Sequence, residues 1–122
     1  MKLPKQDKLV IPIEKLAGYA LNAVREPNKS VMFKSALGFE EKDAGLLAEK
    51  IRIGVSIFTA TPKLKDDWGQ RYQVIMRITG NGKKTANVLT AWIDDENTGE
   101  MRLTTVYITK REVFYDDTDK TV

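Results

Sequence analysis

Basic side chains are the chemistry that one segment of the sequence offers most clearly. The segment DDWGQRYQV, residues 66–74, leads into a strand-like run in which Arg71, Gln73 and Arg77 occupy alternate positions. Alternate residues of a strand point to the same face, so these three side chains form one row. Two guanidinium charges cannot be buried there without partners. The row therefore predicts an open, basic sheet face, although a polar row is also common on the wet face of an antiparallel sheet.

An arginine row favours binding of anions. The planar guanidinium holds a phosphate or a carboxylate through paired hydrogen bonds, whereas lysine supplies a point charge. The net charge of +3, with 20 basic residues interleaved with 17 acidic ones, permits binding to phosphate without requiring it.

The sequence contains neither histidine nor cysteine. Ser-His-Asp, Cys-His and histidine-based zinc chemistry are therefore excluded, as are disulfides and thiolate metal sites. Any catalysis must use Lys, Arg, Tyr, Thr, Gln or carboxylates. The lack of cysteine fits a reducing compartment, and no apolar run resembles a signal peptide or a membrane span of about 18 residues. We predict a cytoplasmic protein that does not enter a membrane.

Two other motifs favour ordinary turns. GNGKKT, residues 80–85, has one residue between its first Gly and the Gly-Lys pair, whereas a phosphate-binding P-loop needs four. Several carboxylates could in principle hold Mg²⁺, but all lie in segments where Asp, Asn and Gly are expected for backbone reasons. We therefore predict no metal or other cofactor. The carboxylates that we assign to turns instead of a Mg²⁺ site are Asp66, Asp67, Asp94, Asp95, Glu96 and Glu100.

The first half of the chain is predicted to be helical. A length of 122 residues suits one domain, residues 1–122, with a compact part of about 9–115 and flexible ends. Apolar periodicity and turn residues predict helices over residues 13–21, 29–37 and 40–58. The last is the strongest pattern, with apolar residues at helical spacing from Ala44 to Phe58.

The second half changes to a period of two, which predicts strands over residues 70–79, 85–93 and 101–110, with 111–115 as a candidate fourth strand. Asn81-Gly82 predicts a two-residue hairpin turn. The fold class is α+β, with N-terminal helices packed on a C-terminal antiparallel sheet of three to four strands. The predicted core packs the third helix against the first strand, through Leu47, Ile51, Val55 and Phe58 on one side and Tyr72, Val74 and Met76 on the other.

Four short motifs, in the same order along the chain, are similar to those of a known domain family. LNAVREPNKSVMFKSALGF, WGQRYQV, LTAWI and MRLTTVYI resemble an uncharacterised bacterial domain family, found as stand-alone small proteins and as C-terminal modules of polymorphic toxins. The resemblance covers residues 9–108. The chain departs from the family pattern at three positions: Ala23 stands in place of a loop Pro, Trp68 in place of a Tyr and Leu89 in place of a strand Arg.

The resemblance implies a set of site residues. Lys29, Arg71 and Arg102 would clamp a phosphate, with Thr90 or Gln70 as a positioning group and Tyr72 or Trp92 as a stacking surface. With Gln73 and Arg77 added from the polar row described above, the full set comprises the candidate catalytic residues Lys29, Arg71, Thr90 and Arg102, and the candidate binding residues Gln70, Tyr72, Gln73, Arg77, Trp92 and Thr105. The departure at Leu89 would leave such a site one Arg short.

Two functions stay open. The order of helices and sheet looks like the metal-independent ribonuclease toxins of the barnase and RelE type, which would make this a small ribonuclease-like domain acting on RNA phosphodiesters. Such chemistry needs neither a metal nor a histidine, because Lys and Arg can stabilise the charge on the phosphorane. The alternative is a non-catalytic inhibitor from a phage or mobile element that binds a host protein or nucleic-acid-processing complex through the basic face. A toxin would also have a small antitoxin or immunity protein as partner.

Overall fold

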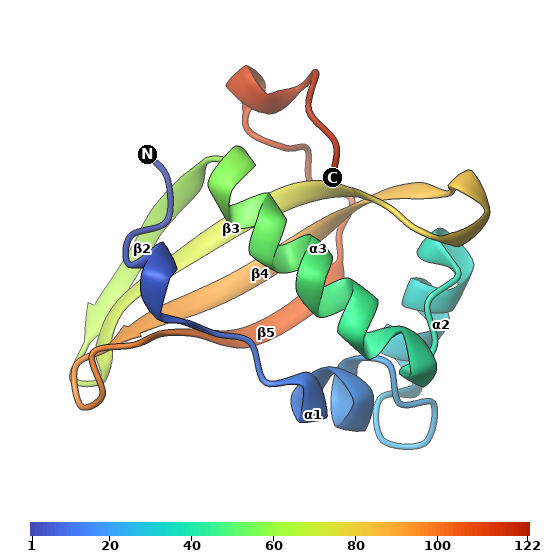
Figure 1. The fold of residues 1–122 in the computed structure, drawn as a ribbon, viewed down its shortest axis with the longest axis horizontal. Coiled ribbons are helices and arrows are strands. Elements are labelled where there is room, and N and C mark those ends of the chain that lie inside the picture. Colours follow the sequence, from blue (N-terminus) through green and yellow to red (C-terminus); the bar gives the residue numbers. More distant parts are fainter.

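The computed structural model describes residues 1–122 and contains three helical regions followed by most of a sheet (Figure 1). The predicted helices are confirmed, with small differences at their ends. A short helix continues into a π-helical turn, and a 3-10 turn precedes the longest helix. These elements are α1 (Ile13–Lys15), η2 (Leu16–Ala20), α2 (Pro27–Leu37), η3 (Glu41–Asp43) and α3 (Ala44–Ile57).

Local signals define where the helices begin and end. Pro27 occupies the first turn of α2, where its missing N–H costs nothing, and Gly38 ends that helix at φ 68°. Glu40 and Asp43 form a capping box ahead of α3.

The sheet has five strands rather than the predicted three to four. They are β1 (Leu9–Val10), β2 (Ala60–Asp66), β3 (Gly69–Thr79), β4 (Thr85–Asp95) and β5 (Met101–Ile108). Their spatial order is β1-β5-β4-β3-β2, and every pair is antiparallel except β1 with β5. The fold class α+β is confirmed, but the sheet is mixed rather than purely antiparallel.

The two strands that were not predicted, β1 and β2, and the one that was predicted wrongly have physical explanations. β2 carries Pro62 and an almost continuous run of exposed side chains, which is typical of an edge strand and hides the alternation that sequence patterns detect. β1 is only two residues long. The candidate strand at 111–115 is wrong, because this segment leads without pairing into a 3-10 turn at Tyr115–Asp117.

The hairpin between β3 and β4 turns where predicted, but through a longer loop. Thr79 pairs with Thr85, which leaves five residues, 80–84, in the connection. Positive φ angles fall at Gly82 and Lys83 rather than at Asn81 and Gly82. The loop therefore lacks the two-residue turn that the Asn-Gly pair favours.

The core lies between α3 and the sheet, as predicted. Leu47, Ile51 and Val55 of α3 are fully buried, as are Val74 and Met76 of β3, while Tyr72 lies half-buried at the rim. Both ends of the chain also pack against this body. Leu3 belongs to the core, and Val122 exchanges backbone hydrogen bonds with Arg77 and Thr79.

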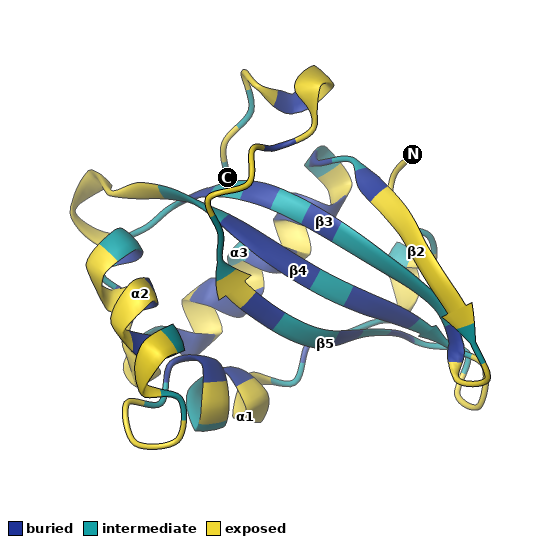
Figure 2. Cartoon of the chain, turned by 180° about the vertical axis from the view of Figure 1, so that it is seen from behind, coloured by how far each residue is buried: buried dark blue, intermediate teal, exposed yellow.

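The helices cover one face of the sheet and leave the other face without a helical layer (Figures 1 and 2). We call the uncovered side the open face. Residues opposite one another in adjacent strands share a face, so strand register identifies its members. These are Arg71, Gln73, Ile75 and Arg77 of β3, Asn87, Leu89, Ala91 and Ile93 of β4, and Arg102, Thr105 and Tyr107 of β5.

Candidate basic site on the open sheet face

Two of the predicted arginines lie in one row across the open face. Arg71 pairs with Ile93, and Ile93 pairs with Arg102 on the next strand. Adjacent strands lie about 4.8 Å apart, which places the two Cα atoms roughly 10 Å apart. The structure therefore brings the two guanidinium groups to the same end of the same face.

Each arginine already has an acidic partner. Arg71 Nε lies 2.8 Å from Asp66 Oδ2, and Arg102 Nη2 lies 2.9 Å from Glu100 Oε1, with Asp95 further away at 3.9 Å. The hydrogen bond from Arg71, with a further one from the Trp68 N–H, lowers the pKa of Asp66. Both guanidinium groups are therefore held in place, partly exposed and partly neutralised.

Lys29 reaches the open face from α2. Its Nζ lies 3.3 Å from Thr105 Oγ1 and 5.9 Å from the centre of the Tyr107 ring. It forms no ion pair with any carboxylate, unlike Arg71 and Arg102. An ammonium within about 6 Å of an aromatic face is attracted to the ring. Lys29 is thus a positioned cation whose charge is free to meet an anion.

The other two polar residues of the β3 row, Gln73 and Arg77, bind the C-terminal segment. Arg77 Nη1 donates hydrogen bonds to the carbonyl oxygens of Thr118 and Lys120 at 2.7 and 3.0 Å. Gln73 Oε1 accepts a hydrogen bond from Arg111 at 3.2 Å. Arg77 therefore has a structural task that its position in the sequence did not indicate.

Four predicted site residues lie on the helix-covered side of the sheet. Thr90 is completely buried; its hydroxyl donates to the Val74 carbonyl and accepts a hydrogen bond from Trp92 Nε1, both at 2.8 Å. Tyr72 shares that side because it pairs with Trp92. Gln70 donates to the backbone oxygens of Lys63 and Arg71. The structure thus separates Thr90, Trp92, Tyr72 and Gln70 from Arg71 and Arg102, because the two groups lie on opposite sides of the sheet.

The DDWGQR segment is a turn that Asp66 organises. Asp66 accepts hydrogen bonds from the Trp68 N–H and from Arg71. Gly69 has φ +141°, and a Cβ there would lie 1.9 Å from the Asp94 carbonyl oxygen, so only glycine fits. The Trp68 side chain is 63% exposed. It therefore lies at the surface, outside the core.

Comparison with known proteins assigns the chain to a family. The model of a domain of unknown function, DUF6883, matches residues 2–110. The chain belongs to this family. No curated protein and no solved structure matches the chain. The matched residues of this DUF6883 chain include Lys29, Arg71, Arg102 and Thr105, whereas most of the C-terminal segment that Arg77 holds lies beyond them.

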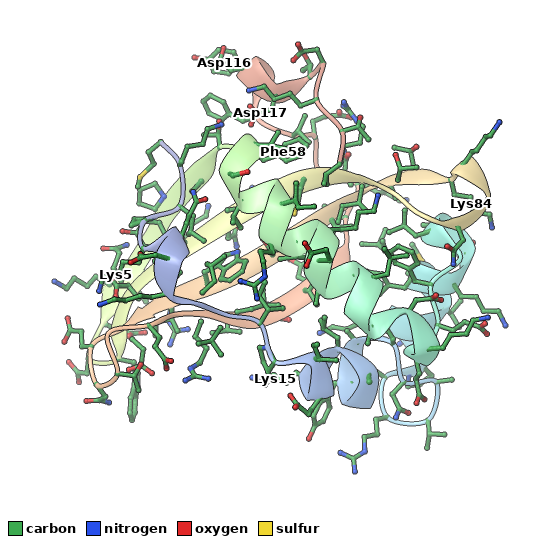
Figure 3. The ribbon with its side chains drawn as sticks, in the orientation of Figure 1. Lys5, Lys15, Phe58, Lys84, Asp116 and Asp117 are labelled. Atoms are coloured by element: carbon green, nitrogen blue, oxygen red, sulfur yellow. The ribbon has the colours of Figure 1, made fainter.

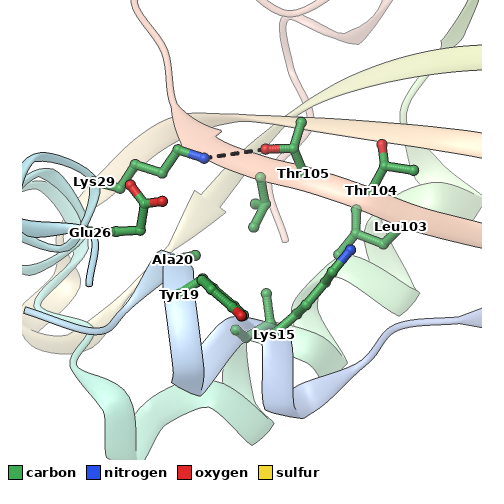
Figure 4. Close-up of a pocket in the computed structure, with 10 residues that line it drawn as sticks. Lys15, Tyr19, Ala20, Glu26, Lys29, Leu103, Thr104 and Thr105 are labelled. Atoms are coloured by element: carbon green, nitrogen blue, oxygen red, sulfur yellow. Dashed lines mark hydrogen bonds between the residues drawn. The ribbon is translucent and has the colours of Figure 1, made fainter. Parts of the chain in front are cut away.

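The DUF6883 fold also forms a pocket that the sequence did not reveal. A cavity of about 170 Å³ lies between η2, α2 and β5, next to Lys29 (Figure 4). Lys15, Glu26 and Thr104 contribute polar groups to its lining. No sequence signal links these three residues, because they come from three separate elements and meet only when the helices dock on the sheet.

Neither a metal centre nor a membrane span is visible in the structure. No group of three or more Asp or Glu side chains lies close enough to hold a metal ion. None of the helices has the length and apolar character needed to cross a lipid bilayer.

Proposed function

We propose that this DUF6883 domain binds RNA on its open sheet face and cleaves it without a metal ion. The observation that carries the proposal is the placement of Lys29, whose unpaired ammonium lies 3.3 Å from the Thr105 hydroxyl, on the face that also carries Arg71 and Arg102. An ammonium and a hydroxyl side by side supply donors to two oxygens of one phosphate.

The face also suits the rest of an RNA strand. Tyr107 is partly exposed beside Lys29 and offers an aromatic ring on this face, whereas its apolar neighbours Leu89 and Ile93 are buried and leave the contact to Tyr107 and the basic groups. Sheet faces that combine aromatic rings with cations bind single strands, because bases stack on the rings while phosphates meet the charges.

The proposed reaction is transfer within the RNA backbone. A 2′-oxygen attacks the adjacent phosphorus as its proton passes to a carboxylate, and the bond to the 5′-oxygen breaks as that oxygen takes a proton from solvent. Glu26 is the carboxylate available for this step, because it lines the pocket that also contains Lys29 and forms no ion pair. Lys29 would stabilise the charge that develops on the phosphorane oxygens.

Incubation of purified protein with total RNA, with and without a chelator, tests the proposal. We expect cleavage that survives the chelator. The Lys29→Ala variant should lose at least about tenfold in rate, as loss of one charge-assisted contact of about 1.4 kcal/mol or more implies. Lys8→Ala is the matched control, because Lys8 is exposed and lies on the N-terminal 3-10 turn Gln6–Lys8. Equal rates in both variants, or cleavage that needs a metal, would refute the mechanism.

A second function is non-catalytic binding through the same face. It is favoured by the ion pairs of Arg71 and Arg102, which leave fewer free groups for catalysis than the sequence implied. RNA that is bound but stays intact would support it. The inhibitor would then occupy a nucleic-acid site on a host complex, and binding should weaken in Lys29→Ala.

The biological setting of either function belongs to the same proposal. A ribonuclease toxin made in the cytoplasm requires an antitoxin or immunity protein, and a basic face would be masked best by an acidic partner. Mixing the chain with the product of a neighbouring gene and measuring residual cleavage would test this pairing.

A further inference from the structure

The pocket beside Lys29 lies against an unpaired stretch of sheet edge. β1 pairs with β5 only at Met101 and Arg102. From Leu103 onward, β5 has no strand on its outer side, and Leu103 and Val106 line the pocket there. Groups of the protein backbone are therefore available to whatever occupies the cavity.

Strand register shows which backbone groups these are. In an antiparallel pair, residues alternate between exchanging hydrogen bonds with the partner strand and pointing away from it. The Thr109 N–H donates to the Asn87 carbonyl, so these two residues form a hydrogen-bonded pair. Every second residue of β5 repeats this pattern, and Thr105, which lies opposite Ala91, is therefore also in a hydrogen-bonded pair. The intervening Val106 therefore directs its N–H and C=O away from β4, toward the pocket.

Neither group has a strand opposite it on the outer side of β5. Val106 takes part in none of the backbone hydrogen bonds of turns, loops and caps, and it is only 4% exposed. Buried backbone donors and acceptors are nearly always paired, because an unpaired group costs about 1–3 kcal/mol. A bound molecule that supplies one acceptor and one donor would satisfy both.

The other walls define the chemistry of such a molecule. Lys15 and Lys29 bring two ammonium groups to the lining, neither of them in an ion pair, against the single carboxylate of Glu26. Figures 3 and 4 show Lys15 extending from α1. Tyr19 and Leu103 provide apolar surface. The volume of about 170 Å³ is below the roughly 300–1,000 Å³ that holds a whole drug-sized ligand. The cavity therefore suits one ring system attached to an anionic group outside it.

We propose that this pocket binds a single nucleotide of the RNA, with its base inside and its phosphate at Lys15 and Lys29. The base presents a neighbouring donor and acceptor on its edge, which match the C=O and N–H of Val106. The proposal rests on the proposed function, since it names the subsite next to the phosphate held by Lys29. It also assigns Lys15, Tyr19 and Val106 to substrate recognition.

Titration of the isotopically labelled full chain with each of the four nucleoside 5′-monophosphates tests the pocket. We expect the Val106 amide resonance to shift with at least one nucleotide, and inorganic phosphate alone to leave it in place. A shift of Val106 by phosphate alone would overturn the placement of the base. The proposal is equally wrong if none of the four nucleotides shifts Val106.

Two variants separate the phosphate from the base. Lys15→Ala removes an exposed charge and should weaken nucleotide binding about tenfold, the effect of losing one charge-assisted hydrogen bond, while Lys8→Ala should not change it. Ala20→Leu fills a buried position in the pocket wall and should abolish the Val106 shift. Thermal unfolding would establish that both variants fold, and Lys15→Ala still tests the site if Ala20→Leu does not.

The failure of this inference differs from the failure of the proposed function. Wild-type protein that leaves RNA unbound and intact, yet shifts Val106 with a nucleotide, refutes the RNA function and keeps the pocket. RNA bound with unchanged affinity by Ala20→Leu refutes the pocket as an RNA subsite and keeps the open face. An extended peptide that shifts Val106 when nucleotides do not would identify the edge as a strand-addition site and overturn the proposal.

Discussion

Lys29 Nζ lies 3.3 Å from Thr105 Oγ1, although the two residues are 76 positions apart in the chain. The contact exists because α2 packs beside β5 and directs the lysine stem around the sheet edge. A helix that lies beside the sheet thereby contributes a charge to the open face (Figure 2). The candidate site thus depends on the docking of one helix as much as on the sheet itself.

Arg71→Ala should change function more than stability. Its ion pair with Asp66 is partly solvent-exposed on both sides, and such pairs contribute roughly 0–1 kcal/mol. We expect urea unfolding to show a loss within that range, while RNA binding weakens severalfold. A much larger loss of stability with unchanged RNA binding would make Arg71 a purely structural residue. Asp66→Asn serves as the comparison, because it breaks the same pair but keeps the guanidinium.

Leu89→Arg should strengthen binding of RNA. Leu89 lies on the open face between Ile75 and Tyr107, at the position where the resemblance described in the sequence analysis implies an arginine. A guanidinium there would add a charge beside Lys29. We expect tighter RNA binding with a steeper salt dependence, since each added phosphate contact raises the slope. The side chain is fully buried, so the variant should also lose stability. Affinity that falls or does not change in a folded variant would contradict the prediction.

Gly54→Ala should destabilise the core. A Cβ on Gly54 would lie 2.5 Å from Met76 Sδ, where α3 packs on β3. Overpacking of this kind costs about 1–3 kcal/mol. Gly45 of the same helix is the control, because a Cβ there meets nothing within 4 Å. Gly45→Ala should stabilise by roughly 0.4–1 kcal/mol. Chemical denaturation of both variants measures the difference, and equal effects would contradict the packing of α3.

Asp117 should make stability depend on acid pH. Burial raises its pKa, but hydrogen bonds from the Thr59 N–H and Lys120 outweigh that effect and leave the pKa below its ordinary value of 3.8. A lowered folded-state pKa stabilises the protein above the unfolded pKa, and this stabilisation is lost as the pH falls through the folded value.

Unfolding measured from about pH 6 down to pH 2 covers that window. Wild-type protein should lose stability more steeply than Asp117→Asn, which cannot ionise. Asp116→Asn is the matched control, since the neighbouring Asp116 belongs to the same 3-10 turn and is exposed (Figure 3). Identical slopes for wild type and Asp117→Asn would show that the carboxylate does not anchor the C-terminal segment to the end of α3.

The sequence alone was enough to predict those features that depend on neighbours along the chain. Apolar spacing located α3, and the alternation through residues 70–79 placed Val74 and Met76 in the core with Arg71 and Gln73 opposite them. Such patterns are reliable because each depends on the geometry of a single element. The sequence did not show which face of β4 is buried, because both faces carry apolar side chains. Thr90 is of a residue type common at the surface, and only its hydrogen-bond partner in the fold shows that it is buried.

Only the tertiary structure decided what surrounds each functional group. Arg71 and Arg102 could be predicted as basic residues, but their acidic partners at Asp66 and Glu100 depend on how two turns fold back on their strands. The pocket exists because β1 ends at Val10 and leaves the edge of β5 free. Sequence patterns record which way a side chain points within its own element, whereas the packing between elements determines which groups meet and which backbone atoms stay unpaired.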